Sequence, residues 1–202
     1  MRGAFAMVNA GVVDDVDYLF GGHLGFKATC DNSLVTMTDG FLATTKLDAE
    51  FKGVSAHAGA APEQGKNALL AAAQAAISLN TISRHSQGSS RINVGVLNAG
   101  TGRNVVPDIA SLKLETRGAT TEINNFMVSE ARRMLAACAA MYDVELKITM
   151  AGGAPACLAD QELGHEVAEL ARAKCHYNEV SEYVDMGGSE DCGYFMERVQ
   201  QK

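Results

Sequence analysis

The sequence contains no apolar run that approaches the roughly 20 residues of a transmembrane helix. Its first residues lack the basic, apolar and small-residue zones of a signal peptide. Basic residues are also few, since 17 Lys and Arg stand against 24 Asp and Glu and give a net charge of -7. Because phosphate binding needs clustered Lys and Arg, this balance argues against a nucleic-acid partner. The sequence therefore predicts a protein that binds neither membranes nor nucleic acid.

The five cysteines include no Cys-x-x-Cys pair. An odd number of cysteines without such a pair is typical of reduced thiols, so we expect the protein in the cytoplasm. Cys138 falls on an apolar helix face and is predicted to lie in the core. The other four could bind metal in principle, but their spacing is unlike that of zinc sites, and we interpret them as core or surface thiols: Cys30, Cys157, Cys175 and Cys192.

Residues 44–152 show the clearest hydrophobic pattern. Apolar residues recur at every second position in four segments, as in half-buried strands, and at helical spacing in two longer ones. The predicted order is a strand at about 46–51, a helix at 67–83, strands at 91–97 and 111–117, a helix at 121–141 and a strand at 143–150. This β-α-β-β-α-β order predicts a ferredoxin-like α+β sandwich with both helices on one face of one sheet. We expect the other face to stay polar and solvated.

Each of these helices carries a stripe of apolar residues. The first stripe contains Leu70, Ala73, Ile77 and Ile82, and the second contains Ile123, Met127, Met134 and Cys138. We expect such stripes to face the sheet.

The flanking segments 1–43 and 153–202 are too short and irregular to form separate domains, and we interpret them as parts of something larger. The first is predicted to hold a helix at 2–11, a buried strand that ends at Phe20, and turns from 26 to 43. The second is predicted to hold a helix at 160–175, a strand at 182–184 and a last helix that Ser189 caps.

Two glycine-rich loops bracket the middle of the chain. The first runs from Gly53 to Gly59 and contains His57, and the second runs from Gly100 to Pro107 and contains Asn104. Loops at strand ends are where a rigid scaffold usually displays its functional groups. Much of the functional signal of the sequence therefore lies in these loops.

Several runs occur in a fixed order: GVSAHAG (53–59), GKNALLAAAQA (65–75), RINVGVLNAGTGRNVVPD (91–108), LETRG (114–118) and GGSED (187–191). Through these runs the chain resembles, from about residue 2 to 198, the dinuclear zinc amidohydrolases and carboxypeptidases. In that family a ferredoxin-like lid that mediates dimerisation interrupts a zinc-binding α/β catalytic domain. The resemblance implies that residues 44–152 are the lid. It also implies that segments 1–43 and 153–202 are partial segments of the catalytic domain.

The chain departs from this family in length and in its metal ligands. Family members are about twice as long, in keeping with the size of two-domain chains. Their Cys-Gly-His-Asp motif, glutamate pair and last metal-binding histidine have no counterpart here. We therefore expect an internal fragment, a truncated gene product or a piece of a split enzyme. Such a chain would bind metal poorly and be inactive alone, because the catalytic glutamate is missing.

The resemblance implies roles for two histidines. His23, in Gly-Gly-His-Leu-Gly, matches a position that gives one imidazole to zinc; from the residues alone it is an ordinary loop histidine. His57 matches a lid histidine that reaches the active site of the opposite protomer and stabilises the oxyanion there. The alternative for His57 is a residue that only orders its own turn.

Four further residues are candidates for substrate binding. Asn104 can donate its amide to a substrate oxygen, or it can adopt a left-handed turn conformation. Arg117, on the polar face of its strand, suits bidentate binding of a carboxylate, with Arg103 as a weaker competitor and cross-strand pairing as the alternative. Gly188 and Ser189 are predicted to shape the substrate pocket, with Ser189 a helix cap rather than a nucleophile.

The resemblance implies hydrolysis of an amide that joins an acyl or aryl-acyl group to an amino acid such as glutamate. Two zinc ions and a glutamate would carry the reaction in a full-length relative, and a homodimer would form through the lid. Two other interpretations remain open. The chain could be an inactive dimerisation module or a complementing piece of a split enzyme, or it could be a ferredoxin-like small-molecule sensor.

Overall fold

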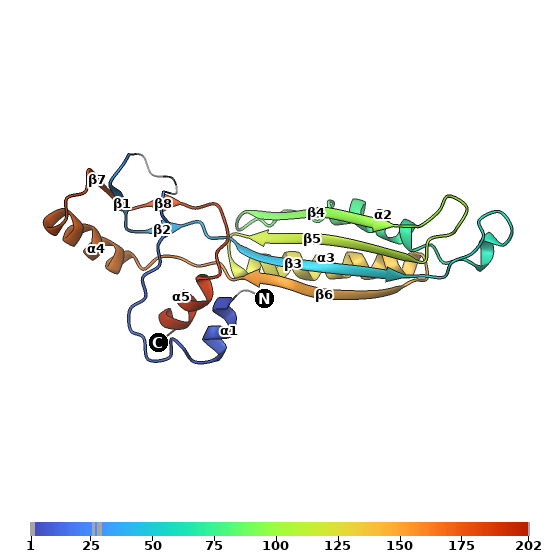
Figure 1. The fold of residues 1–202 in the computed structure, drawn as a ribbon, viewed down its shortest axis with the longest axis horizontal. Helices are drawn as coiled ribbons and strands as arrows, with labels where there is room; N and C mark the ends of the chain where they lie inside the picture. Colours follow the sequence, from blue (N-terminus) through green and yellow to red (C-terminus); the bar gives the residue numbers. More distant parts are fainter. Residues whose placement is uncertain (1–2, 26, 28–29, 202) are drawn as a thin grey trace. The chain divides into compact units, whose positions relative to one another are not determined.

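The structure is a computed structural model that describes residues 3–25, 27 and 30–201. Its contacts divide the chain into two compact units, each shown in Figure 1. The lid unit is Thr44–Gly153, and the flanking unit is Met1–Ala43 together with Ala154–Lys202.

The lid unit contains one four-stranded sheet in the order β4-β5-β3-β6. Neighbouring strands run in opposite directions (Figure 1), and β4 and β5 pair antiparallel with a bulge between Val94 and Val96. Along the chain the elements are β3 (Ala43–Lys52), the 3-10 turn η1 (Pro62–Gln64), α2 (Ala68–Leu79), β4 (Ser90–Ala99), β5 (Ile109–Gly118), α3 (Thr121–Met141) and β6 (Glu145–Ala154). This order and topology confirm the predicted ferredoxin-like sandwich.

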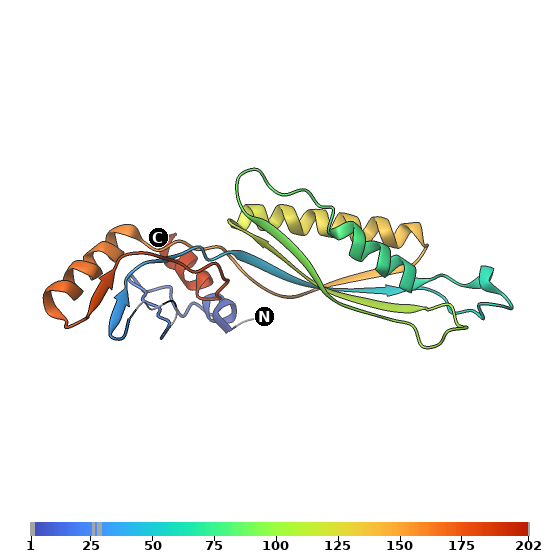
Figure 2. The ribbon, with the colours of Figure 1, turned by 90° about the horizontal axis from the view of Figure 1, so that it is seen from above.

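Both helices cover the same face of the sheet, as Figure 2 shows. The alternation along β3 explains why: Leu47, Ala49 and Phe51 are fully buried, whereas Lys46, Glu50 and Lys52, which alternate with them, are exposed. Successive side chains of a strand point to opposite faces, so one face is apolar and takes the helices. The other face, here called the open face, is polar.

The stripe predicted for α3 is largely the buried one. Ile123, Met127 and Cys138 are buried, and Met134 is partly buried against the same core. The helix begins where Thr120 caps it, with the Thr120 side chain accepting a hydrogen bond from the backbone N–H of Ile123 at 3.2 Å.

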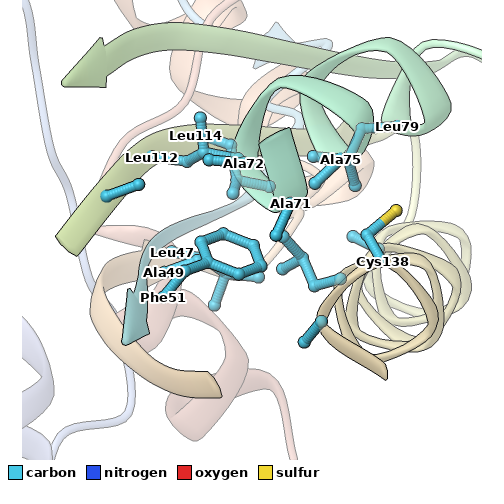
Figure 3. Close-up of a cluster of buried hydrophobic side chains, with 14 of the residues drawn as sticks. Leu47, Ala49, Phe51, Ala71, Ala72, Ala75, Leu79, Leu112, Leu114 and Cys138 are labelled. Atoms are coloured by element: carbon cyan, nitrogen blue, oxygen red, sulfur yellow. The ribbon is translucent and has the colours of Figure 1, made fainter. Parts of the chain in front are cut away.

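The stripe predicted for α2 is wrong at Leu70 and Ile77, which are 45% and 66% exposed, whereas Ile82, which follows the helix, is buried. A face of small residues lies in the core instead, as Figure 3 shows for three of them: Ala68, Ala71, Ala72 and Ala75 are fully buried. Small side chains let a helix approach its neighbours closely, and α2 packs against α3 and the sheet through this alanine face. The large apolar residues did not identify the buried face of α2, because the small size of the alanine side chains determines how this helix packs.

A buried polar network fixes the end of β5 against the start of α3. The Thr116 hydroxyl donates to Asn124 Oδ1 at 2.8 Å, and Asn124 Nδ2 donates to the Thr45 hydroxyl at 2.9 Å. Gly118 lies so close to Asn124 that a Cβ at this glycine would collide with the Asn124 backbone. These contacts hold the neighbouring Arg117 on a rigid part of the sheet.

The flanking unit has shorter elements. Its helices are α1 (Gly3–Asn9), α4 (Gln161–Lys174) and α5 (Gly193–Gln200), and its strands are β1 (Ser33–Val35), β2 (Thr38–Asp39), β7 (Glu179–Ser181) and β8 (Val184–Asp185). The strands form two parallel pairs, β1 with β7 and β2 with β8. Arg2, where the sequence predicts the first helix to begin, lies outside the described residues.

Several predictions for this unit are wrong. The buried strand that was expected to end at Phe20 is absent from the described residues 12–20, which form turns and coil. Tyr18 and Phe20 are 70% and 67% exposed, so they do not supply the burial that such a strand needs. The segment 26–43, predicted to be turn-like, has the expected turn at Asp31 and Asn32 but also holds β1 and β2, and the predicted strand at 182–184 is replaced by β7 and β8.

No helix within the described part of the chain has both the length and the apolar character that crossing a membrane would require.

Candidate functional site

The two glycine-rich loops of the lid unit are joined by backbone hydrogen bonds. His57 and Val105 form an antiparallel bridge. The N–H of Ala58 donates to the carbonyl of Asn104 at 2.9 Å, and the N–H of Val106 donates to the carbonyl of Ala56 at 2.9 Å. His57 and Asn104, 47 residues apart in sequence, therefore lie on one two-loop platform.

The ring of His57 has a defined hydrogen-bonding state. Its Nδ1 accepts from the backbone N–H groups of Gly59 at 3.2 Å and Ala60 at 3.1 Å. A ring nitrogen that accepts carries no proton, so the neutral ring holds its proton on Nε2 and can donate from there. The side chain is exposed. One nitrogen thus orders the local turn, as the alternative interpretation expected, and the other nitrogen is presented as a donor.

Asn104 is also exposed and does not have a left-handed backbone. The alternative that it serves as a left-handed turn residue is therefore wrong. Gly100 adopts the positive φ of this loop instead, at 80°. Glycine reaches that conformation without strain, so Asn104 is not required for the shape of the turn.

Arg117 lies on the open face of the sheet, near the end of β5. Its Nε donates to Glu115 Oε1 at 2.7 Å, and both side chains are about one-third exposed. Directly across on β4, its partner in the strand register is Arg91. Arg117 thus pairs with Glu115 of its own strand, through one edge of the guanidinium group only, and the cross-strand pairing with a Lys or Glu that was considered as an alternative is absent from the described residues.

The platform and Arg117 lie at opposite ends of the lid sheet. Asn104 precedes the first residue of β5, Ile109, whereas Arg117 is next to the last, Gly118. A ten-residue antiparallel strand spans about 30 Å at roughly 3.4 Å per residue. Figure 1 shows the two loops at the end of the sheet where β3 finishes and β5 begins. A single small substrate cannot contact both places within one copy of the chain. Arg103 belongs to the platform, not to the Arg117 end.

The remaining candidates lie in the flanking unit. His23 Nε2 is 3.4 Å from Glu190 Oε2, with both side chains partly exposed. Gly188 accepts a backbone hydrogen bond at 2.7 Å from Leu42. The Ser189 hydroxyl is buried and has no hydrogen-bond partner within the described residues.

Ser189 is not the cap of the last helix, which corrects the prediction. Helix α5 begins at Gly193, and its N-cap residue is Cys192, which makes no side-chain capping bond. A buried hydroxyl without a partner is uncommon and needs an explanation. Because no described group accepts its proton, the hydroxyl also lacks the base that would make Ser189 a nucleophile.

Metal ligands do not converge in the part of the chain that the structure describes. No group of three or more His, Cys, Asp or Glu side chains there could hold a metal ion. His23 and Glu190 supply two donors, one short of a catalytic zinc site with three protein ligands. The described residues therefore do not fit a complete zinc site.

A pair of thiols in the flanking unit was not predicted to interact. Cys157 and Cys192 are hydrogen-bonded to each other, and Cys157 is 6% exposed. The bond to Cys192, followed by burial, raises the pKa of Cys157, whereas the bond from Cys157 lowers the pKa of Cys192. Of the two thiols, Cys192 is therefore the one that loses its proton more readily. The two residues are 35 positions apart, and no local pattern connects them.

Comparison with known proteins identifies the central part of the chain. Residues 42–141 match the family model described as the peptidase dimerisation domain. Over these residues the chain is therefore similar to a peptidase dimerisation domain. The matched residues include β3, α2, β4, β5 and α3, and β6 (Glu145–Ala154) follows them.

Relatives align with almost the whole chain. It is 49% identical over 201 residues to the indole-3-acetyl-aspartic acid hydrolase of Enterobacter agglomerans and 47% identical over 201 residues to one of the p-aminobenzoyl-glutamate hydrolase subunits of Escherichia coli K12, in both cases over 99% of this chain and 46% of the relative. The crystal structure of the aminobenzoyl-glutamate utilization protein from Klebsiella pneumoniae superposes with a TM-score of 0.90 at 46% identity and covers 100% of this chain and 51% of that one. The resemblance inferred from the motifs is confirmed. The chain spans about half the length of the relatives that it matches.

Proposed function

We propose that the chain supplies the lid and the substrate-binding residues of an amidohydrolase that cleaves an N-acyl or aminobenzoyl amino-acid amide with a glutamate-like amino acid. The relatives named above, which act on an aspartic acid and a glutamate conjugate, support this class of substrate. The observation that carries the proposal is the His57 ring, whose Nδ1 is occupied by two backbone N–H groups so that Nε2 presents a proton.

Each candidate residue has a role in this proposal. His57 donates from Nε2 to the oxygen of the scissile carbonyl as negative charge develops on it. Asn104, next to it on the platform, donates its amide to a second substrate oxygen. Arg117 binds a substrate carboxylate with the part of its guanidinium group that Glu115 leaves available. Gly188 and the buried Ser189 hydroxyl line the pocket for the remainder of the substrate.

The described residues do not supply a complete set of zinc ligands, so zinc binding in this proposal requires ligands other than these residues. His23 is the one residue that the motifs assign as a ligand, and with Glu190 it does not complete a site. The roles proposed for His57, Asn104 and Arg117 involve no metal. The free state of all five cysteines supports the reducing cytoplasm as the compartment.

The separation of the platform from Arg117 supports a homodimer. Because about 30 Å separates the two ends of β5, one substrate meets both sets of residues only if two copies contribute. We therefore assign His57 and Asn104 of one copy to the substrate held by Arg117 of the other. The match of residues 42–141 to a dimerisation domain supports the same arrangement.

A chimera would test the proposal directly. This chain would replace the aligned 201 residues of the Escherichia coli p-aminobenzoyl-glutamate hydrolase chain, to which it is 47% identical. We expect the chimera to hydrolyse p-aminobenzoyl-glutamate, and His57→Gln to lower kcat by about 100-fold or more, as the loss of an oxyanion donor does. His85→Gln, in the same unit, is the matched control and should leave kcat unchanged. A folded chimera that does not hydrolyse the substrate, or an equal effect of the two substitutions, would contradict the proposal.

Mixing two inactive chimeras would test the crossed arrangement. One would carry His57→Gln and the other Arg117→Gln, so that only a mixed dimer holds one intact site. Random reassociation makes half of the dimers mixed, and activity should recover to about a quarter of that of the unsubstituted chimera. If mixing restored nothing while exchange of protomers was demonstrated, the two residues would act within one copy.

The alternative is a dimerisation module or split-enzyme piece without activity of its own. It is favoured by the incomplete set of metal ligands in the described residues. Under this alternative the isolated chain forms dimers in sedimentation experiments and does not cleave an N-acyl glutamate when zinc is added, whereas cleavage by the purified chain would exclude it.

A further inference from the structure

The open face of the lid sheet has a hollow of about 340 Å³ beside Arg117. Its lining consists of Arg84, Arg91, Ile92, Asn93, Glu115 and Arg117. This volume is within the roughly 300–1,000 Å³ range of small-molecule sites. The hollow lies wholly within the lid unit, because all six residues belong to Thr44–Gly153.

The charge of the hollow is opposite to that of the whole chain. Three arginines and one glutamate give the lining a net charge of +2, whereas the chain carries -7. Two of the arginines, Arg91 and Arg117, are direct partners in the register of β4 and β5. Like charges placed directly opposite each other on a sheet are destabilising. A protein with an excess of acidic residues thus concentrates unfavourable positive charge at one spot.

Glu115 neutralises only part of this charge. It binds Nε of Arg117 at 2.7 Å, and no other ion pair of Arg117 is present in the described part of the chain. The two terminal nitrogens of Arg117 remain for a ligand. Arg91 is exposed and has Asn93, not a carboxylate, as its neighbour on the same face of β4. A ligand with one negative charge would leave one of the two excess positive charges uncompensated.

We propose that Arg84, Arg91 and Arg117 form a dicarboxylate site, in which Arg117 binds one carboxylate of an acidic amino-acid moiety and Arg91 with Arg84 binds the other. The planar fork of a guanidinium group binds a carboxylate with two parallel hydrogen bonds, and this geometry favours a carboxylate over a neutral amide. Arg91 is therefore the residue that determines specificity for a second acidic group. This inference rests on the proposed role of Arg117, but it concerns binding and needs no hydrolysis.

The test is a titration of the 202-residue chain with two matched probes. N-acetylglutamate carries two carboxylates, and N-acetylglutamine replaces the second by a neutral amide of the same shape. The arginine Nε–H signals are followed by nuclear magnetic resonance. We expect the signals of Arg84, Arg91 and Arg117 to shift, with N-acetylglutamate binding about tenfold more tightly, the ratio expected for one hydrogen-bonded charge.

Three variants separate a built site from general charge attraction. Arg91→Gln should bind both probes equally, and Arg91→Lys, which keeps the charge without the fork, should recover part of the difference. Arg132→Gln removes the same charge from an exposed position on α3 in the same unit and should behave like the unsubstituted chain. The dispersion of the amide spectrum shows in each case that the variant is folded.

Three results would overturn the inference: equal binding of the two probes by the unsubstituted chain, no shift of the three arginine signals at saturating probe, or an equal loss of discrimination in Arg132→Gln and Arg91→Gln. Failure of the proposed function is a separate outcome. A chain that discriminates between the probes, in a chimera that cleaves no N-acyl amino acid, would retain the dicarboxylate site and lose the enzymatic role. A chimera that cleaves glutamate and glutamine conjugates equally would lose the dicarboxylate site alone.

Discussion

The lid unit and the flanking unit bury their apolar residues to very different degrees. In the lid, four ten-residue strands and two helices enclose a continuous core that includes Phe51, Leu112 and Leu135, each fully buried. In the flanking unit the strands have two or three residues, and large apolar side chains such as Phe20 and Leu158 are 67% exposed. Stability is rarely uniform across a structure, and it follows buried apolar contact. The platform and the arginine hollow are therefore held by the more stable unit, and His23 and Ser189 by the less stable one.

Truncation of a core leucine should show this difference most strongly. Leu135→Ala removes a fully buried side chain from α3 and should cost about 2–5 kcal/mol of the free energy of unfolding. Leu158→Ala, at a 67% exposed position in the flanking unit, should change it by less than about 0.5 kcal/mol. Urea denaturation followed by circular dichroism measures both. Similar losses would show that the flanking unit is as tightly packed as the lid.

Addition of one methyl group should also lower the free energy of unfolding more in the lid unit than in the flanking unit, but by a smaller difference. A Cβ at Gly118 would collide with backbone atoms, among them Asn124 Cα at 2.9 Å, so Gly118→Ala should cost at least about 1–3 kcal/mol. At Gly164, inside α4, the collision is with Cγ of the buried Met37, a side-chain atom rather than backbone. Alanine also favours a helix over glycine by about 1 kcal/mol, so Gly164→Ala should cost about 1 kcal/mol less than Gly118→Ala. The same denaturation experiment measures both variants, and an equally large loss at Gly164 would mean that Met37 cannot move.

Thiol labelling of the native protein should rank the stability of the two units without the need for any substitution. Among the three cysteines that are not exposed, Cys192 should react first, because the hydrogen bond from Cys157 lowers its pKa and favours the reactive thiolate. Cys157 should follow when the flanking unit opens, and Cys138, 3% exposed in the lid core, should react last. Mass spectrometry of peptides after timed labelling gives the three rates. If Cys138 reacted before Cys157, the order of stability of the two units would be reversed.

The smallest expected effect is the pH dependence of stability that the pair of His165 and Glu182 in the flanking unit contributes. The hydrogen bond to Glu182, followed by its charge, raises the pKa of His165 above its usual value. The folded state then holds the proton more tightly than the unfolded state, so the stabilisation is complete below the unfolded pKa of about 6.5 and is lost as pH rises through the raised folded pKa. Glu182 has a lowered pKa, first because of its bond to His165, so its contribution is present above its unfolded pKa and lost only in acid.

Comparison of the unsubstituted chain with His165→Gln tests this pair. The urea midpoint of the variant should be lower at about pH 5.5, below the unfolded pKa of histidine, and the difference should shrink as the pH rises through the raised folded pKa of His165. The effect should be small because the pair is exposed to solvent. A difference that grew with pH would contradict the direction of the shift.

Long elements were predictable from the sequence and short ones were not. Helix α3 has the bounds that its periodicity predicts, 121–141, and the four lid strands lie within a few residues of their predicted positions. Strands β1 and β2 have two or three residues and pair with β7 and β8, more than 140 positions away. Such strands exist because of partners that no local pattern specifies.

The same reason explains which parts of the candidate site were missed. His57, Asn104 and Arg117 stand in motifs that can be found by spacing, and their placement at opposite ends of the sheet required only the strand order. Arg91 joins Arg117 through the register of β4 and β5, which depends on a bulge that spacing does not reveal. The hydrogen bond between the free thiols of Cys157 and Cys192 depends on tertiary structure alone.

On most amphipathic helices the large apolar residues are buried and constrained, and we expect the opposite pattern of substitution on α2. Ala71, Ala72 and Ala75 leave no space for a larger side chain, so a lineage that keeps this fold must keep small residues there. Leu70 and Ile77, the larger residues, face outward and can be exchanged without loss of the lid fold. The outward face of this helix is then free to vary in sequence, whereas its face of small residues is not.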